Sequence, residues 1–237
     1  MKKFFSYLSC LSLFIYPNCA YCAEKPYNYT SNVSTIKEDE TDKGAFLNVA
    51  FRTKYVKRWS LFNNTKNESL NDHLMDTGRI AHMLVLIKNK KYGGKLDANR
   101  AAVLAMYHDV TEVISGDMPT PIKYKTAGMK PLYSKMEDKI TEDLLSLLPE
   151  EFKEDFCTIL NRKENEKELW QIVKYADTIS AFIKCLEEKN SNNNDFDKAY
   201  DRLEKELLET DAPEVQYFIK TFLPSFGYNP TKNLKTN

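Results

Sequence analysis

The sequence contains few cysteines, and most of them lie at one end. Three of the five cysteines fall within the first 22 residues, so that only Cys157 and Cys185 belong to the body of the chain. Two cysteines are too few for a disulfide scaffold, and no CxxC pair occurs in the body, which excludes a zinc knuckle there. Cys157 and Cys185 could pair if the protein is exported; free buried thiols are the alternative.

Glycine and proline are also scarce, and the net charge is zero. The 237 residues include 7 Gly and 9 Pro, and 34 Lys and Arg balance 34 Asp and Glu. Leu, Lys, Glu, Ala and Ile are plentiful, which favours helix. The zero net charge gives no general electrostatic footprint for nucleic acid, so we expect no nucleic-acid polymer as a partner. A chain of this length makes one sizeable domain or two small ones.

Residues 1–23 have the layout of a secretory signal peptide. Two lysines precede an apolar run from Phe4 to Tyr16, and small residues follow at Ala20 and Ala23. The run is too short to span a bilayer comfortably, so we expect no stable membrane insertion. We expect an exported or periplasmic protein if the leader is cleaved. An uncleaved N-terminus, and hence a cytoplasmic protein, is the alternative. Residues 24–44 are polar and predict a flexible linker.

Helical patterns follow one another from Ala45 onward. Glycines at 93 and 94 end the second pattern. Asp97 caps the third, which predicts one continuous helix over residues 98–115 that Gly116 terminates. The long pattern over residues 164–189 places these apolar residues on one face: Leu169, Ile172, Val173, Ala176, Ile179, Ile183 and Leu186. There is no alternating strand pattern of useful length. The sequence therefore predicts one all-α domain over residues 45–228, a helical bundle, followed by a tail at 229–237.

A chain with only three histidines places one of them beside acids in an apolar run. In LAMYHDVTEVISGDMPTP (residues 104–121), His108 and Asp109 precede Glu112. On a continuous helix these three side chains share a face. Buried carboxylates are costly unless they meet a charge or a metal, and imidazole with carboxylates suits a divalent cation. An adjacent His-Asp pair alone is weak support for a metal site.

Two further residues strengthen the metal interpretation. His73 opens the preceding helix, and Asp177 lies in an apolar helical face, KYADTISAF. The order His, His-Asp, Asp over three helices resembles the ligand order of the HD-domain metal phosphohydrolases. An acid paired with Lys174 at the surface is the alternative for Asp177. We expect His82 to be packed or solvent-facing, and the Glu-Glu pair at 187–188 to be a solvated helix end.

The chain more closely resembles the bacterial HD-domain 5′-deoxynucleotidases, in order from about Ala45 to Phe226. The motifs are KRWSL (57–61), KNKKYGG (88–94), HDxxE followed by GDxPTP (108–121), KYADTISAFIKCLEE (174–188) and FLPSF (222–226). The resemblance implies an HD-domain helical bundle that converts deoxyribonucleoside 5′-monophosphates to a deoxynucleoside and phosphate. It also implies a homodimer.

The resemblance implies the roles of individual residues as well. The residues matching the metal ligands are His73, His108, Asp109 and Asp177. Glu112 matches the acid that positions or activates the attacking water, and Arg58 and Trp59 match the substrate-contacting pair, the arginine orienting the phosphate. The loop that holds the nucleoside and discriminates the sugar matches Asp117, Met118, Pro119 and Thr120. Asp72 departs from the glutamate expected there, which bears on metal affinity rather than on reaction class.

The cofactor implied is one divalent cation, Co, Mn or another first-row metal, because several metals accept His and Asp ligands. An HD-domain hydrolase acting on a nucleoside triphosphate or a signalling nucleotide is the second candidate, although no extra basic cluster lies near the motifs. A catalytically idle nucleotide-binding module is the third, and the presence of every matched ligand together with Glu112 opposes it. Without the resemblance, Trp59 is equally well a core residue.

Overall fold

A computed structural model describes residues 42–119 and 128–227 of the chain. The predicted signal peptide, residues 24–41 of the predicted linker and the predicted tail lie outside the described residues. Within the described ranges there is no strand, only an isolated antiparallel bridge between Lys57 and Ser69, so the all-α class is confirmed. No helix in those ranges combines the length and apolar character needed to cross a membrane.

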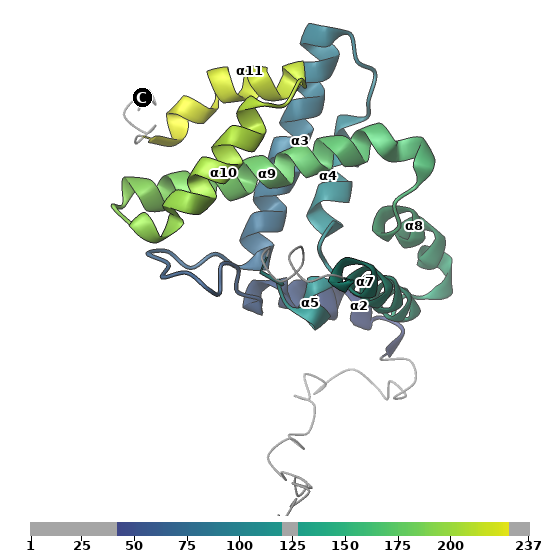
Figure 1. The fold of residues 1–237 in the computed structure, drawn as a ribbon. Coiled ribbons are helices and arrows are strands. Elements are labelled where there is room, and N and C mark those ends of the chain that lie inside the picture. The colour runs from purple at the N-terminus through teal and green to yellow at the C-terminus, as the bar shows by residue number, and fades with distance from the viewer. Residues whose placement is uncertain (1–41, 120–127, 228–237) are drawn as a thin grey trace, which may run out of the picture. The chain divides into compact units, whose positions relative to one another are not determined.

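The helices of this domain are joined by mostly short connections (Figure 1). In chain order the elements are α2 (Ala45–Ala50), η1 (Phe51–Tyr55), α3 (Leu70–Tyr92), α4 (Ala98–Tyr107), α5 (Glu112–Ser115), α7 (Met129–Ser146), α8 (Glu150–Leu160), η2 (Glu164–Glu166), α9 (Lys167–Asn190), η3 (Asn194–Phe196), α10 (Asp197–Leu208), α11 (Pro213–Thr221) and η4 (Leu223–Gly227).

The ends of α3 and α4 follow from the residues beside them. Ser69 and Asp72 form a capping box at the start of α3, where each side chain accepts a hydrogen bond from the backbone amide of the other. Gly93 ends α3 with a φ of 71°, a left-handed conformation that glycine adopts without steric strain. The Asp97 carboxylate accepts hydrogen bonds from two backbone amides in the first turn of α4. The predicted caps at 93 and 97 are thereby confirmed.

The prediction of one helix through residues 98–115 is wrong in its middle. α4 ends at Tyr107 and α5 begins at Glu112, and a turn connects them. In that turn the Glu112 amide donates to the Asp109 carbonyl at 3.0 Å, a tighter span than the α-helical one. The His108 ring also hydrogen-bonds to the Ala105 carbonyl in the last turn of α4. The last turn of a helix leaves such carbonyls without partners within the helix. His108, Asp109 and Glu112 therefore do not lie on one helix face.

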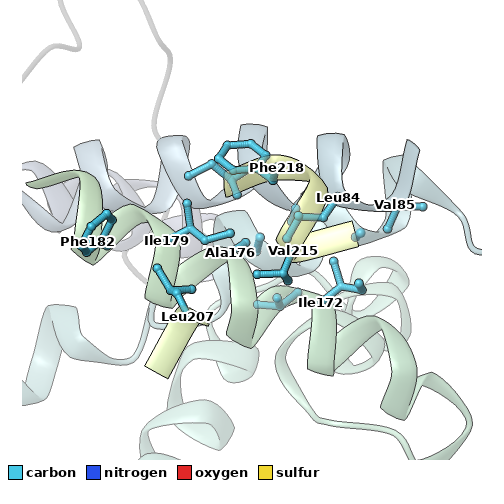
Figure 2. Close-up of a cluster of buried hydrophobic side chains, with 14 of the residues drawn as sticks. Leu84, Val85, Ile172, Ala176, Ile179, Phe182, Leu207, Val215 and Phe218 are labelled. Atoms are coloured by element: carbon cyan, nitrogen blue, oxygen red, sulfur yellow. The ribbon is translucent and has the colours of Figure 1, made fainter. Parts of the chain in front are cut away.

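The main core lies where α9 crosses α3 and α4, with α10 and α11 packed beside them (Figure 1). Figure 2 shows side chains from these helices meeting in one apolar cluster, among them Leu84, Ile172, Ala176, Ile179, Leu207, Val215 and Phe218. Of the face predicted for the long helix, the buried members are Leu169, Ile172, Val173, Ala176 and Ile179. The last two predicted members, Ile183 and Leu186, are only partly buried. Each fully buried aliphatic side chain contributes about 1.5–3 kcal/mol.

A second apolar cluster supports the turn after α4. Val110 is 2% exposed within it, and the other buried members are Phe46, Ile140, Leu144 and Leu148. Phe46 of α2 packs edge-on against Phe156 of α8, with ring centroids 4.6 Å apart. Because Val110 directly follows Asp109, this packing holds the backbone that carries the predicted His-Asp pair.

The C-terminal end of α9 differs from the sequence interpretation. Glu187 is exposed, as expected, but Glu188 is 1% exposed and the expectation of a solvated side chain is wrong for it. Its carboxylate accepts hydrogen bonds from Lys184, from Asn193 and from the segment at Thr65 and Lys66. A buried carboxylate requires such partners, and most of them come from a segment more than a hundred residues away in the sequence.

Candidate active site

The four predicted metal ligands come together from three helices. His73 lies in the first turn of α3, His108 caps α4 and is followed by Asp109, and Asp177 lies in the middle of α9. His73 Nε2 is 3.0 Å from Asp177 Oδ1, and His108 Nε2 is 3.1 Å from Asp109 Oδ2. The donor atoms of His73, His108 and Asp109 all lie within 4.8 Å of one another. Side chains that lie far apart in the sequence therefore meet in one cluster.

The two imidazoles of this cluster are more deeply buried than its two carboxylates. The side chains of His73 and His108 are 0% and 5% exposed, whereas those of Asp109 and Asp177 are 25% and 40% exposed. Both Nε2 atoms are buried and, although each lies near a carboxylate oxygen, neither makes a hydrogen bond of acceptable geometry. Buried nitrogens that converge with carboxylate oxygens in this way fit the donor set of a divalent cation.

The opposite ring nitrogens are held by neighbouring groups. His108 Nδ1 lies 2.7 Å from the Ala105 carbonyl, which can only accept, so this nitrogen carries the proton. The Nε2 atom of a neutral His108 is therefore a lone-pair donor. His73 Nδ1 lies 3.1 Å from the Ser180 hydroxyl on α9. Such contacts fix ring orientation and tautomer in metal sites.

The electrostatics of the cluster favour ionised carboxylates. Burial, followed by the charge of Arg58, lowers the pKa of His73 to about 4. Burial alone would lower the pKa of His108, but the Asp109 carboxylate opposes it and the pKa rises to about 9. Burial alone would raise the pKa of Asp109 and Asp177, yet His108 and His73 respectively hold them below the usual range. Both carboxylates of the cluster are therefore ionised near neutral pH.

Arg58 and Trp59 lie on the segment between η1 and α3, beside the cluster. The Arg58 side chain is 11% exposed, and its Nη1 lies 4.0 Å from Asp117 Oδ2. Burial alone would lower its pKa, but Asp117, Glu68 and the two predicted aspartate ligands raise it. Trp59 donates from Nε1 to Glu68 Oε2 at 2.7 Å and packs against the main core. Trp59 is thus a core contact, and its role as a substrate-contacting residue stays a prediction.

Glu112 and the predicted sugar-reading loop follow the His-Asp turn. Glu112 begins α5 and is 5% exposed. Gly116 turns the chain with a φ of 73°, after which Asp117, Met118 and Pro119 are partly buried. The ion pair at 4.0 Å brings Asp117 to Arg58 across about sixty residues of sequence. Thr120, the last predicted member of the loop, lies outside the described residues.

Two further residues have clear positions outside the cluster. Asp72 accepts hydrogen bonds from the Ser69 amide and hydroxyl at 3.0 and 2.7 Å, so it caps α3. The substitution of aspartate for the expected glutamate thus falls on a helix cap. His82, further along α3, is partly buried and lies apart from the grouped donor atoms, as expected.

Sequence reasoning missed Glu68 and Ser180, which orient predicted site residues. Glu68 accepts from both Arg58 and Trp59, and Ser180 contacts His73. Ser180 follows Asp177 by three positions on one helix, so the helical period could have placed it near the site. Glu68 lies in a polar stretch with no periodicity, and no local signal distinguishes it.

The fold is the HD-domain fold. The fold matches that of an HD-domain phosphohydrolase from Listeria innocua with a TM-score of 0.67 at 20% sequence identity, covering 76% of this chain and 87% of the other. More specifically, residues 45–226 match the YfbR-like 5′-deoxynucleotidase family, and the chain belongs to it. The resemblance seen in the sequence is confirmed.

Relatives from two bacteria carry the same description. The chain is 46% identical to a 5′-deoxynucleotidase of Vibrio vulnificus over 175 residues, which are 74% of this chain and 90% of the relative. It is 42% identical to a 5′-deoxynucleotidase of Photobacterium profundum over 186 residues, which are 78% of this chain and 96% of the relative. The similarity therefore covers nearly the whole length of both relatives.

Proposed function

We propose that this protein is a metal-dependent 5′-deoxynucleotidase, which hydrolyses deoxyribonucleoside 5′-monophosphates to a deoxynucleoside and inorganic phosphate. Membership of the family and 46% identity to a named 5′-deoxynucleotidase support the reaction class. The observation that carries the proposal is the convergence of the His73, His108 and Asp109 donor atoms within 4.8 Å, with Asp177 at 3.0 Å from His73.

We assign His73, His108, Asp109 and Asp177 as the ligands of one divalent cation, with Co and Mn the first metals to test. Such a cation, when bound, polarises the phosphate and lowers the pKa of the attacking water. The buried imidazoles and the more exposed carboxylates would hold it together, and the exposure of the carboxylates leaves an approach from solvent. The ionised state of both aspartates adds the negative charge that a divalent cation requires.

We assign Arg58 to bind the substrate phosphate and Glu112 to activate the attacking water. A guanidinium can donate two parallel hydrogen bonds to phosphate oxygens, and the charge of Arg58 is maintained by the surrounding acids. Glu112 accepts a proton from the water as the water oxygen bonds to phosphorus. The bond between phosphorus and the 5′ oxygen breaks, that oxygen takes up a proton from solvent as the deoxynucleoside leaves, and Glu112 returns its proton to solvent.

The loop at Asp117, Met118, Pro119 and Thr120 is assigned the nucleoside, together with Trp59. The Asp117 carboxylate accepts a hydrogen bond from a sugar hydroxyl, which orients the deoxyribose. Its distance of 4.0 Å from Arg58 Nη1 supports these assignments, because the phosphate and the sugar of a nucleoside monophosphate are adjacent.

A phosphate-release screen tests the proposal. Deoxy- and ribonucleoside 5′-monophosphates are each assayed with Mn, Co, Mg and Zn, and release from deoxynucleotides should exceed release from ribonucleotides. Glu112→Ala should reduce kcat about 100-fold or more while retaining the bound metal. Unchanged turnover in this variant refutes the role of Glu112, and absence of release from every deoxynucleotide refutes the reaction.

Two separate proposals concern the N-terminal leader and the oligomeric state. We propose that residues 1–23 are removed on export and that the enzyme acts outside the cytoplasm; N-terminal sequencing of the mature protein that finds Met1 intact refutes this. We also propose a homodimer, on the family resemblance alone. Light scattering that gives the mass of a single chain refutes the dimer.

A further inference from the structure

The segment between η1 and α3 folds back on itself, so that Glu68 lies opposite Arg58. The Arg58 amide donates to the Glu68 carbonyl at 3.1 Å, and the Leu70 amide donates to the Val56 carbonyl at 2.8 Å. These bonds flank an isolated antiparallel bridge. The two ends of the segment are thereby paired, and the backbone at Glu68 is fixed relative to the backbone at Arg58.

One oxygen of the Glu68 carboxylate serves two adjacent side chains. Oε2 accepts from Trp59 Nε1 at 2.7 Å and lies 3.4 Å from Arg58 Nε. The Arg58 and Glu68 side chains are 11% and 12% exposed, so water competes little for these contacts. Removal of this carboxylate would release an indole and a guanidinium together.

Trp59 also has an unusual backbone conformation. Its φ is 56°, a left-handed value that large side chains rarely adopt. The ring packs against Phe62 and Phe196, each with centroids 5.3 Å away. These apolar contacts hold the indole ring, and the hydrogen bond to Glu68 fixes the position of its nitrogen.

A second buried carboxylate holds the middle of the same segment. Glu188 of α9 accepts from the Thr65 amide at 3.1 Å, from the Thr65 hydroxyl at 2.6 Å and from the Lys66 amide at 3.3 Å. Lys184 pairs with Glu188 and also donates to the Lys66 carbonyl. Glu68 therefore follows an anchored backbone rather than a free loop.

The other end of the Arg58 guanidinium faces the cluster. Nη1 lies 4.0 Å from Asp117, and Asp109 and Asp177 also act on its charge. Glu68 on the Nε side and Asp117 on the Nη side thus set the direction of the fork. An arginine held at Nε presents its terminal nitrogens in one direction, which is the geometry that bidentate phosphate binding needs.

We propose that Glu68 is a positioning residue that aims Arg58 at the substrate phosphate and Trp59 at the sugar, and so sets substrate affinity and deoxyribose selection. The inference rests on the proposed function, because it places the substrate beside these two side chains. Glu68 does not touch the reacting atoms, so its removal acts on KM and on the ratio of deoxy- to ribonucleotide kcat/KM more than on kcat.

Two substitutions separate the two effects. Glu68→Gln keeps an oxygen that accepts from the indole but removes the charge opposite Arg58, so KM for deoxynucleotides should rise about tenfold or more with deoxyribose selection retained. Glu68→Ala removes both contacts, so KM should rise and the preference for deoxynucleotides should also fall. Adding Glu68→Ala to Trp59→Phe should cause no further loss of selection, because the phenyl ring has no N–H to hold.

Glu214→Gln is the matched control. Glu214 is a buried carboxylate that pairs with Lys88 at 3.0 Å near the other end of α3, so its loss should lower Tm and leave KM and selection unchanged. Circular dichroism and Tm are measured for every variant.

Kinetics of the wild-type protein distinguish the inference from the reaction on which it rests. If the wild-type protein is active, Glu68→Gln keeps the wild-type KM and Glu68→Ala keeps the wild-type selection, then the role of Glu68 is overturned. The reaction itself then still stands. A wild-type protein that releases no phosphate from any deoxynucleotide overturns the proposed function, and the inference with it.

Discussion

Replacement of Glu188 by Ala should destabilise the fold by about 3–5 kcal/mol, because it leaves a buried ammonium without its counter-charge. Lys184 and Glu188 are 5% and 1% exposed, so solvent cannot take the place of the lost partner. The Thr65 and Lys66 amides and the Asn193 side chain also lose an acceptor. Each donor that stays buried and unpaired costs about 1–3 kcal/mol of stability. Lys184 still donates a hydrogen bond to the Lys66 carbonyl, which offsets part of this loss.

Urea unfolding followed by far-ultraviolet circular dichroism measures this loss. The double variant Lys184→Met with Glu188→Leu should be more stable than Glu188→Ala alone, because no charge then remains buried. Glu187→Ala is the control, since Glu187 is exposed on the same turn of α9, and it should change stability by less than about 0.5 kcal/mol. A loss below about 1 kcal/mol for Glu188→Ala, which is the range of exposed ion pairs, refutes the reasoning.

The same variant has a defined pH dependence. Burial alone would raise the pKa of Glu188, but hydrogen bonds from Lys184, Thr65 and Asn193 hold it far below its usual range. The stability it contributes is therefore present above the ordinary glutamate pKa of about 4.3 and is lost as pH falls below that value. The difference between wild type and Glu188→Ala should be constant from neutral pH down to about 5 and then shrink. A difference that grows on acidification contradicts this assignment.

Three further predictions concern other parts of the fold. Burial raises the pKa of the Cys185 thiol to about 12, so iodoacetamide under native, mildly alkaline conditions should label exposed Cys157 and spare Cys185 in peptide mass maps; equal labelling contradicts this. Ser180→Ala removes the group beside His73 Nδ1 and should weaken metal affinity about 10–100-fold in chelator competition; unchanged affinity would show that Ser180 does not support the ligand. Ile179 is 0% exposed, and Ile179→Ala should cost about 2–5 kcal/mol in urea unfolding, whereas a cost below about 1 kcal/mol would place it outside the tightly packed core.

Local sequence signals were sufficient for several helix ends and for the core face of α9. Helix caps such as Asp97 and Gly93 act within a few residues, so their signals can be read from the sequence alone. The apolar period of α9 likewise identified its core face around Ala176. The metal-ligand candidates came from the resemblance of the His, His-Asp, Asp order to that of the HD-domain phosphohydrolases, and the fold brings these side chains close together.

Contacts between distant segments could not be read in the same way. The Glu188 side chain looked solvated because its partners at Thr65 and Lys66 lie more than a hundred residues earlier in the sequence. Glu68 was missed because the fold, and no local pattern, brings its carboxylate to Trp59. The break after Tyr107 was missed because apolar periodicity continues across a turn that the His108 ring and Val110 packing stabilise.

The central claim is that His73, His108, Asp109 and Asp177 hold a catalytic divalent cation. Metal content per chain, measured by inductively coupled plasma mass spectrometry after dialysis against Mn or Co, tests it most directly. We predict one metal ion per wild-type chain and its loss in His108→Ala, with the helical circular dichroism signal retained and phosphate release abolished. A His108→Ala protein that keeps the wild-type metal content, or a wild-type enzyme that hydrolyses deoxynucleotides with no metal bound, contradicts the claim.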